Sequence, residues 1–316
     1  MINKDFFPKE ATIENMINFS SDKRYLSVRQ IDEYITLPLR GGNVCYDKKM
    51  IYLILFLLGL AVGSFLNVVI YRLRWGDSPM RGRSYCDQCK KTISWFDNIP
   101  LLSFILLKGK CRKCKRKIPI EYPLTELLVG IEFVWVYWLL SVNFKFFGTW
   151  EGFYSLALLI YWLILFSGSL AIIIFDFKYM LIPDEVLYPL IGLALLRLPF
   201  SHQWQVVPAA LASGAFLLSL YWITKGKGMG LGDVKLALLL GLVLGWPKIL
   251  VAYFIAFLTG AGVGVILILS KKKRLKDKIA FGPFLLTAML AAKLWGEQIW
   301  QWYLKACLPT GRVLHF

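Results

Sequence analysis

Two aspartates border apolar segments in the second half of the chain, where acidic residues are few. Asp176 follows the apolar run that ends at Phe175, and Asp233 ends the sequence GKGMGLGD and precedes another apolar run. Acidic side chains beside membrane-spanning segments are costly, which favours a functional role. Two neighbouring carboxylates can hydrolyse a peptide, because one is ionised and activates a water while the other keeps its proton and polarises the carbonyl. We therefore predict that Asp176 and Asp233 form a catalytic pair.

The positions of these aspartates on their predicted helices indicate different roles. Asp233 lies at a helix N-terminus, where the helix dipole favours the ionised form, so it is the expected base, although a helix cap alone would also explain an acid at this position. Asp176 lies at a helix C-terminus, where the dipole opposes ionisation by ~0.3–1 kcal/mol, so it is the expected acid. Asp184 follows Pro183 at a predicted helix start and is interpreted as a helix cap. Alternating glycines before Asp233 leave the backbone bare, as is needed where a substrate backbone comes close; they are Gly226, Gly228, Gly230 and Gly232.

A second set of residues with chemical potential consists of two C-x-x-C pairs, CDQC and CRKC, with 21 residues between them. Their members are Cys86, Cys89, Cys111 and Cys114. Two such turns can face each other and offer four thiolates tetrahedrally to Zn(II). Because four sulfurs leave no position open for water, we predict a structural zinc; the alternatives are a redox pair and unrelated thiols. The remaining cysteines, Cys45 and Cys307, are interpreted as incidental.

The composition of the 316 residues excludes a water-soluble globule. Hydrophobic residues make up 57% of the chain and charged residues only 18%, and apolar runs of about 20 residues recur. Histidine is restricted to His202 and His315, so neither a Ser-His-Asp triad nor an H-E-x-x-H zinc protease is available. The net charge of +17 is spread over short loops. This distribution argues against a nucleic-acid partner and favours contact with anionic membrane lipids.

The pattern of apolar runs predicts an all-α polytopic membrane protein with about eight transmembrane helices and a zinc-binding loop domain after the first. The first span, Ile51 to Ile70, carries a small-residue face of Gly59, Gly63 and Ser64 that suits close helix packing. The other predicted spans are Leu124 to Val142, Gly152 to Phe175, Glu185 to Pro199, Val206 to Thr224, Val234 to Trp246, Ile249 to Ser270 and Pro283 to Trp300.

Charge in the loops predicts the orientation and the domain boundaries. Residues 72–123 contain 13 Lys or Arg against 4 Asp or Glu, which assigns this loop to the cytoplasm and the chain before residue 51 to the outside. We predict four parts: an N-terminal extension (1–49), the first transmembrane helix (50–71), the cytoplasmic zinc-binding loop domain (72–123) and a transmembrane peptidase domain (124–316). The extension is polar, and we interpret it as a disordered tail or as translation upstream of a native start at Met50.

From Met50 onward the chain resembles the prepilin peptidases, the membrane aspartyl proteases that process type IV pilins and pseudopilins. The resemblance rests on GSFLNVVIYRL, the C-x-x-C pairs around SWFDNIPLLSFILLKGKC, YPLTELL, FDFKYMLIPD, GMGLGDVKLALLLG and FGPFL, in that order. It implies that Asp176 and Asp233 are catalytic, by their places in D-x-x-x-x-x-I-P-D and G-x-G-D. It also implies a multi-pass protein of the bacterial cytoplasmic membrane, which removes a short basic leader after its glycine on the cytoplasmic side.

The resemblance implies a second activity as well. Family members with the cysteine loop N-methylate the newly exposed residue with S-adenosylmethionine, so we expect both activities here. The sequence does not locate the methyl-donor pocket, because no glycine fingerprint occurs in the loop. Glu126 and Asn67 are polar residues in the membrane-proximal motifs, and they are candidates for this site or for helix packing.

Two other functions are consistent with parts of the pattern. A proton-coupled transporter or channel also uses intramembrane acids, but it predicts broken helices at mid-membrane, whereas these aspartates lie at one edge. An assembly scaffold that docks a partner through the zinc loop would explain the cysteines but gives no reason for the two aspartates.

Overall fold

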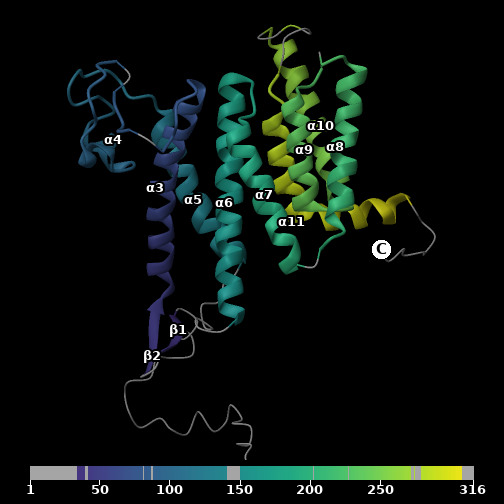
Figure 1. The fold of residues 1–316 in the computed structure, drawn as a ribbon, viewed down its shortest axis with the longest axis horizontal. Helices are drawn as coiled ribbons and strands as arrows, with labels where there is room; N and C mark the ends of the chain where they lie inside the picture. Colours follow the sequence, from purple (N-terminus) through teal and green to yellow (C-terminus); the bar gives the residue numbers. More distant parts are fainter. Residues whose placement is uncertain are drawn as a thin grey trace, which may run out of the picture.

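The computed structural model describes residues 34–39, 42–80, 82–86, 88–140, 150–201, 203–226, 228–271, 274 and 279–307. Within these described ranges, eight long helices form the body of the molecule (Figure 1). They are α3 (Lys48–Arg74), α5 (Glu121–Leu140), α6 (Trp150–Tyr179), α7 (Asp184–Ser201), α8 (Val206–Ile223), α9 (Leu231–Leu244), α10 (Lys248–Leu269) and α11 (Gly282–Cys307). Each coincides with one of the apolar runs picked out in the sequence.

Five of these helices are long and apolar enough to cross a membrane: α3, α5, α6 from Gly152 onward, α8 and α10. The protein is therefore a helical multi-pass membrane protein, as the sequence predicted. Helix α9 has 14 residues and packs against α7, α8, α10 and α11, and its Leu236, Leu239 and Leu240 are completely buried. Its apolar character is explained by contact with protein, so the count of eight spans stays a prediction.

A two-stranded antiparallel hairpin precedes the first helix and departs from the predicted all-α fold. Strand β1 (Tyr34–Leu39) pairs with β2 (Gly42–Asp47), with Tyr34 opposite Asp47, and β2 leads directly into α3. Residues 1–33, His202 and His315 lie outside the described residues. The interpretation of residues 1–49 as an extension is therefore not tested.

Helices α3 and α5 pack closely because glycines line their contact. A Cβ atom added to Gly63 would lie 2.7 Å from Cα of Glu126, and one added to Gly59 would lie 2.7 Å from the carbonyl oxygen of Val129. These distances are too short for any side chain, so only glycine permits the approach. The predicted small-residue face of the first span is confirmed, and it brings Glu126 against the backbone of α3.

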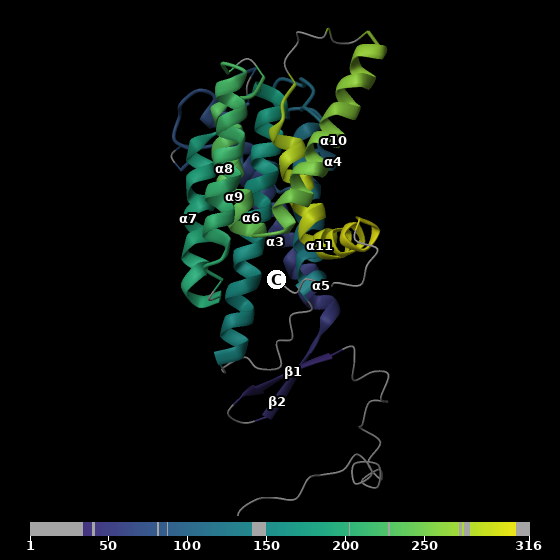
Figure 2. The same cartoon turned by 90° about the vertical axis from the view of Figure 1, so that its right-hand side faces the viewer.

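The loop after α3 lies at one end of the helix bundle. It contains two short helical segments, η1 (Trp95–Asn98) and α4 (Leu102–Leu106), between the C-x-x-C turns. Helix α3 runs toward this loop, α5 runs away from it, and α6 runs toward it again. The C-terminal end of α6 therefore lies at the same end of the bundle as the loop (Figures 1 and 2). The connection between α8 and α9 lies there too.

Candidate functional site

The two aspartates occupy the ends of two helices that are distant in sequence. Asp176 lies in the last turn of α6 and Asp233 in the first turn of α9. Both are buried, with 4% and 8% of their surface exposed, and both lie at the end of the bundle that carries the cysteine loop (Figure 1). The predicted placement at one edge of the helical region is therefore found.

Several contacts bring the segments that bear these aspartates together. The carboxylates of Asp176 and Asp233 are near enough to interact electrostatically. A Cβ atom added to Gly232 would lie 3.1 Å from Cβ of Ile182, and one added to Gly282 would lie 3.5 Å from Cδ1 of the same isoleucine. The Ile182 side chain therefore lies between the start of α9 and the start of α11, and the three segments converge around it.

Each carboxylate accepts from one backbone amide: Asp176 from the first residue of α11, and Asp233 from the N-cap residue of its own helix, so that Asp233 also caps α9. The Gly282 N–H donates to Oδ2 of Asp176 at 3.0 Å, and the Gly230 N–H donates to Oδ2 of Asp233 at 3.1 Å. Among the described residues neither carboxylate has a further hydrogen bond, so the second oxygen of each is available to a water or a substrate. The sequence predicts that Gly230, among the alternating glycines before Asp233, lets a substrate backbone come close. It does not predict the hydrogen bond from Gly282 to Asp176, although Gly282 lies in the FGPFL motif.

Asp184, interpreted from the sequence as a helix cap, begins α7 and has a different partner. Its carboxylate oxygens accept from Nζ of Lys235 on α9 at 2.7 and 2.9 Å. This ion pair ties the start of α7 to α9. The carboxylate of Asp184 thus contacts Lys235 and is not hydrogen-bonded to the same amides as Asp176 and Asp233.

The contact at Gly282 gives a first testable prediction, because a Cβ atom there would lie 2.6 Å from Oδ2 of Asp176. In Gly282→Ala either the carboxylate or α11 must move. Since a misplacement of about 1 Å can cost about 100-fold, we expect the kcat of leader cleavage to fall by about 10- to 100-fold. Cleavage of a pilin precursor by the purified variant measures this. Gly262→Ala is the matched control, because nothing lies within 4 Å of a Cβ at that position; equal rates for both variants would contradict the prediction.

The four predicted cysteine ligands meet in the loop. Their sulfur atoms all lie within 4.8 Å of one another, and Sγ of Cys86 lies 3.8 Å from Sγ of Cys114. Zn–S bonds of about 2.3 Å in a tetrahedron give S···S separations of about 3.8 Å. The cluster could therefore hold a zinc ion in the predicted four-cysteine manner.

Both C-x-x-C turns have the same backbone geometry. The carbonyl of Cys86 accepts from the Lys90 N–H at 2.8 Å, and the carbonyl of Cys111 accepts from the Lys115 N–H at 3.0 Å. Lys90 and Lys115 both adopt a positive φ, 54° and 58°, just after the second cysteine of each pair. Two equivalent turns thus present two sulfurs each to a common centre.

The sulfurs influence one another's protonation. Backbone amides of Cys114 and Lys113 hydrogen-bond to the Cys111 thiol and lower its pKa to about 7. At Cys114 a hydrogen bond from the Arg116 backbone lowers the pKa, but desolvation and the three neighbouring sulfurs outweigh it and raise the pKa to about 11. A thiolate at Cys111 therefore forms readily, and a divalent cation can replace the remaining protons.

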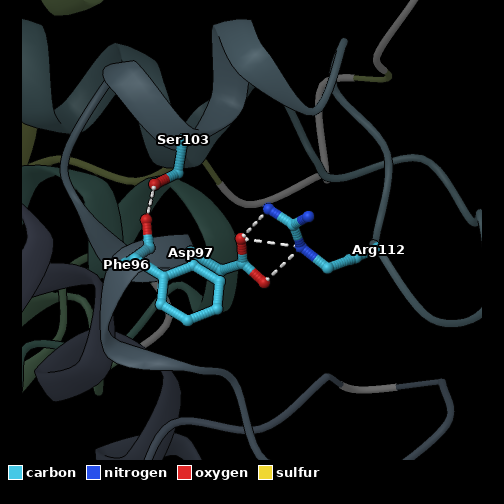
Figure 3. A network of polar contacts seen from close by, with 4 residues as sticks. All are labelled: Phe96, Asp97, Ser103 and Arg112. Atoms are coloured by element: carbon cyan, nitrogen blue, oxygen red, sulfur yellow. Dashed lines mark hydrogen bonds and ion pairs between the residues drawn. The ribbon is translucent and has the colours of Figure 1, made fainter.

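Polar contacts hold the segment between the two turns. The Arg112 guanidinium binds both carboxylate oxygens of Asp97, at 2.7 to 3.0 Å, and the Ser103 hydroxyl donates to the Phe96 carbonyl at 2.8 Å (Figure 3). Arg112 lies within the second C-x-x-C pair, so its bond to Asp97 ties the intervening segment to the cysteine cluster.

Comparison with known proteins finds two family models, each of which matches a part of the chain. Residues 57–140 match the family model of the bacterial peptidase A24 N-terminal domain, and this match contains all four clustered cysteines. Residues 163–265 match the model of the type IV leader peptidase family, and this match contains Asp176 and Asp233.

Curated relatives extend over most of the chain. A prepilin leader peptidase/N-methyltransferase of Aeromonas salmonicida is 36% identical over 290 residues, 81% of this chain and 94% of the relative. Proteins of the same name from Pseudomonas aeruginosa and Bacillus subtilis are 35% and 30% identical, and the alignments cover 79% and 81% of this chain and 92% and 98% of the relatives. No solved structure matches the chain significantly. By these matches and by its motifs, the chain belongs to the type IV leader peptidase family.

Proposed function

We propose that this protein removes the leader peptide from prepilins or pseudopilins and N-methylates the residue that cleavage exposes. Membership of the family and the names of the curated relatives support both activities. The observation that carries the proposal is the position of two buried aspartates, Asp176 at the end of α6 and Asp233 at the start of α9, on segments that converge around Ile182 at the end of the bundle that also bears the cysteine cluster (Figure 1).

For the peptidase, the two carboxylates act on a water molecule and on the scissile carbonyl. The ionised carboxylate takes a proton from the water as its oxygen attacks the carbonyl carbon, while the protonated carboxyl donates to the carbonyl oxygen. As the C–N bond of the resulting tetrahedral species breaks, a proton passes to the leaving amine. Both carboxylates receive an N–H at Oδ2, which leaves the other oxygens for these transfers.

Which aspartate is the acid and which is the base depends on the ends of more than one helix. The end of α6 opposes ionisation of Asp176, as the sequence indicated, but the Gly282 N–H at the start of α11 supports the charged form of the same group. Asp233 is supported by Gly230 in the same way. We therefore propose that the pair shares a single proton, with Asp233 as the expected base.

We place both activities on the cytoplasmic side of the bacterial inner membrane. The basic loop of residues 72–123 lies at the same end of the bundle as the aspartates, and an excess of Lys and Arg marks the cytoplasmic side. In this loop Trp95, Ile105 and Leu106 expose most of their apolar surface. Together with the surrounding bases they suit contact with anionic lipid headgroups.

For the methyltransferase, we propose that the four cysteines hold a structural zinc and that S-adenosylmethionine supplies the methyl group. A separation of 3.8 Å between Sγ of Cys86 and Sγ of Cys114, with all four sulfurs within 4.8 Å of one another, suits a tetrahedral zinc, which would stabilise the loop and take no part in the chemistry. The bound donor supplies a methyl group on a cationic sulfur. The chain's own residues must then bind that cation and present the new amine in its neutral form.

Mass spectrometry of the processed pilin tests the two activities together. The full-length, zinc-loaded protein is incubated with a pilin precursor, with and without S-adenosylmethionine. We expect loss of the leader in both samples and the added mass of one methyl substitution only with the donor. A precursor whose glycine before the cleavage site is replaced serves as the control and should stay intact. Recovery of uncleaved wild-type precursor would contradict the peptidase, as expected for a transporter or a scaffold.

A further inference from the structure

A cavity lies between the cysteine loop and the membrane helices that flank it. Its volume is about 300 Å³, and its lining comes from the second half of α3, the loop and the start of α5. This size is at the lower end of the range of small-molecule sites, about 300 to 1,000 Å³. No residue of α6 or α9 lines it, so the cavity is distinct from the aspartate pair.

Glu126 of α5 brings a buried carboxylate to the wall of this cavity. It is 9% exposed, and its Oε2 accepts from the Leu101 N–H at 2.8 Å. The Ser64 hydroxyl of α3 is its other hydrogen-bond partner. Within the part of the chain that the structure describes, no Lys or Arg forms an ion pair with Glu126. The carboxylate is thus held by neutral donors alone.

The other acid in the cavity wall differs in this respect. Asp97 is bound through both oxygens by Arg112 (Figure 3). A buried carboxylate is costly unless a cation accompanies it. Glu126 therefore marks a position where a ligand with a positive charge would be stabilised.

The rest of the lining suits a ligand that also carries a carboxylate and an aromatic base. Tyr85, Phe104 and Tyr122 supply aromatic surface. Besides Arg112, the basic residues of the lining that could bind a carboxylate are Arg72, Lys91, Lys113, Arg116 and Lys117. The cluster residues Cys86, Cys89 and Cys111 form part of the same wall. A molecule that combines a cationic centre, a carboxylate and a purine matches this set of groups.

We propose that this cavity binds S-adenosylmethionine, with the Glu126 carboxylate as the counter-ion of its sulfonium. The proposal rests on the N-methyltransferase activity proposed above and gives that activity a location. It also accounts for the association of the cysteine cluster with methylation, because the zinc site forms a wall of the cavity. Two contacts join this region to the helix that bears Asp176: the Arg74 guanidinium lies 4.6 Å from the Tyr179 ring centre, and Glu121 pairs with Lys178.

Equilibrium binding of S-adenosylmethionine to the full-length, zinc-loaded protein, without pilin, tests the proposal. In Glu126→Gln the amide oxygen can still accept from Leu101, so the loop contact is kept while the charge is lost. We expect the Kd to rise at least about 10-fold. Glu132→Gln is the matched control: Glu132 lies on the same helix, accepts from the Ser167 hydroxyl at 3.1 Å and is outside the cavity lining. Its Kd should stay at the wild-type value.

S-adenosylhomocysteine, whose sulfur is neutral, shows whether Glu126 recognises the charge of the ligand or only maintains the structure of the cavity. Its Kd is compared with that of S-adenosylmethionine in the wild-type protein and in Glu126→Gln. The wild-type protein should prefer the sulfonium ligand, and Glu126→Gln should lose most of that preference while its zinc content stays unchanged. An unchanged Kd, or equal weakening of both ligands, would overturn the proposal. So would normal donor binding with a raised KM for the pilin amine, because Glu126 would then serve the methyl acceptor. If the wild-type protein neither binds the donor nor methylates, the proposed methyltransferase itself fails.

Discussion

Leader cleavage is expected to fall by about 10³-fold or more when either Asp176 or Asp233 is replaced by asparagine, because an amide can neither take a proton from water nor supply one to the carbonyl. The shape of each site is preserved: the amide oxygen can still accept from Gly282 in Asp176→Asn and from Gly230 in Asp233→Asn. The loss should therefore appear in kcat, measured as release of the leader from a purified precursor.

The double variant adds a sharper expectation. If the two carboxylates act as one unit on one water, removing the second after the first costs little more. Asp176→Asn/Asp233→Asn should then be about as slow as either single variant. If the fold-decrease in kcat of the double variant equals the product of the two single decreases, the carboxylates do not act in one catalytic step.

Asp184→Asn is the matched control for these variants. It removes a carboxylate at the same end of the bundle, but this one is paired with Lys235 and partly open to solvent. Its kcat should stay within a few-fold of the wild-type value. Binding of S-adenosylmethionine by all the variants should be unchanged, which shows that they are folded. A folded Asp176→Asn protein that cleaves at the wild-type rate would refute the dyad.

The helices could be predicted from the sequence because apolar runs of this length have few other solutions. Every predicted span coincides with a helix, and the ends differ by a few residues at most places. Hydropathy alone does not separate a helix that faces lipid from one surrounded by protein, and α9 is the example: its 14 residues are apolar and packed among four other helices.

The hairpin of β1 and β2 lies in a polar segment, where no apolar run indicates a secondary-structure element. A local signal is nevertheless present: YITLPL contains Tyr, Ile and Thr, GNVCYD contains Val and Tyr, and Gly41 and Gly42 lie at the junction of the two segments. Turn residues between two such runs are typical of a hairpin.

The sequence predicts the reactive groups of the candidate site but not the contacts that position them. Asp176 and the four cysteines have local patterns that point to chemistry. The contact between Asp176 and Gly282 joins residues 106 positions apart and depends on how α6 meets α11. Glu126 was only one of two polar candidates, because the cavity it borders is assembled from three separate segments that no local pattern connects.

Replacing Cys111 with serine should abolish binding of the proposed zinc and, with it, the proposed methyl-donor site. A hydroxyl is a poor zinc ligand compared with a thiolate, so bound zinc in the purified protein should fall from about one per chain to nearly none. Cys86, Cys89 and Cys111 wall the cavity, and without zinc the two turns lose their common centre. We therefore expect loss of S-adenosylmethionine binding together with loss of zinc, measured by metal analysis and equilibrium binding.

The peptidase should survive this change, because its aspartates lie on α6 and α9, away from the cavity wall. Cys45→Ser is the control, since it changes a cysteine and keeps all four ligands, and it should retain zinc and donor binding. Removing zinc from the wild-type protein with a chelator should reproduce the Cys111→Ser result, and adding zinc back should restore donor binding to the wild-type protein alone. If the zinc-free protein binds S-adenosylmethionine normally, the metal has no part in shaping the cavity, and the cysteine cluster must serve another purpose.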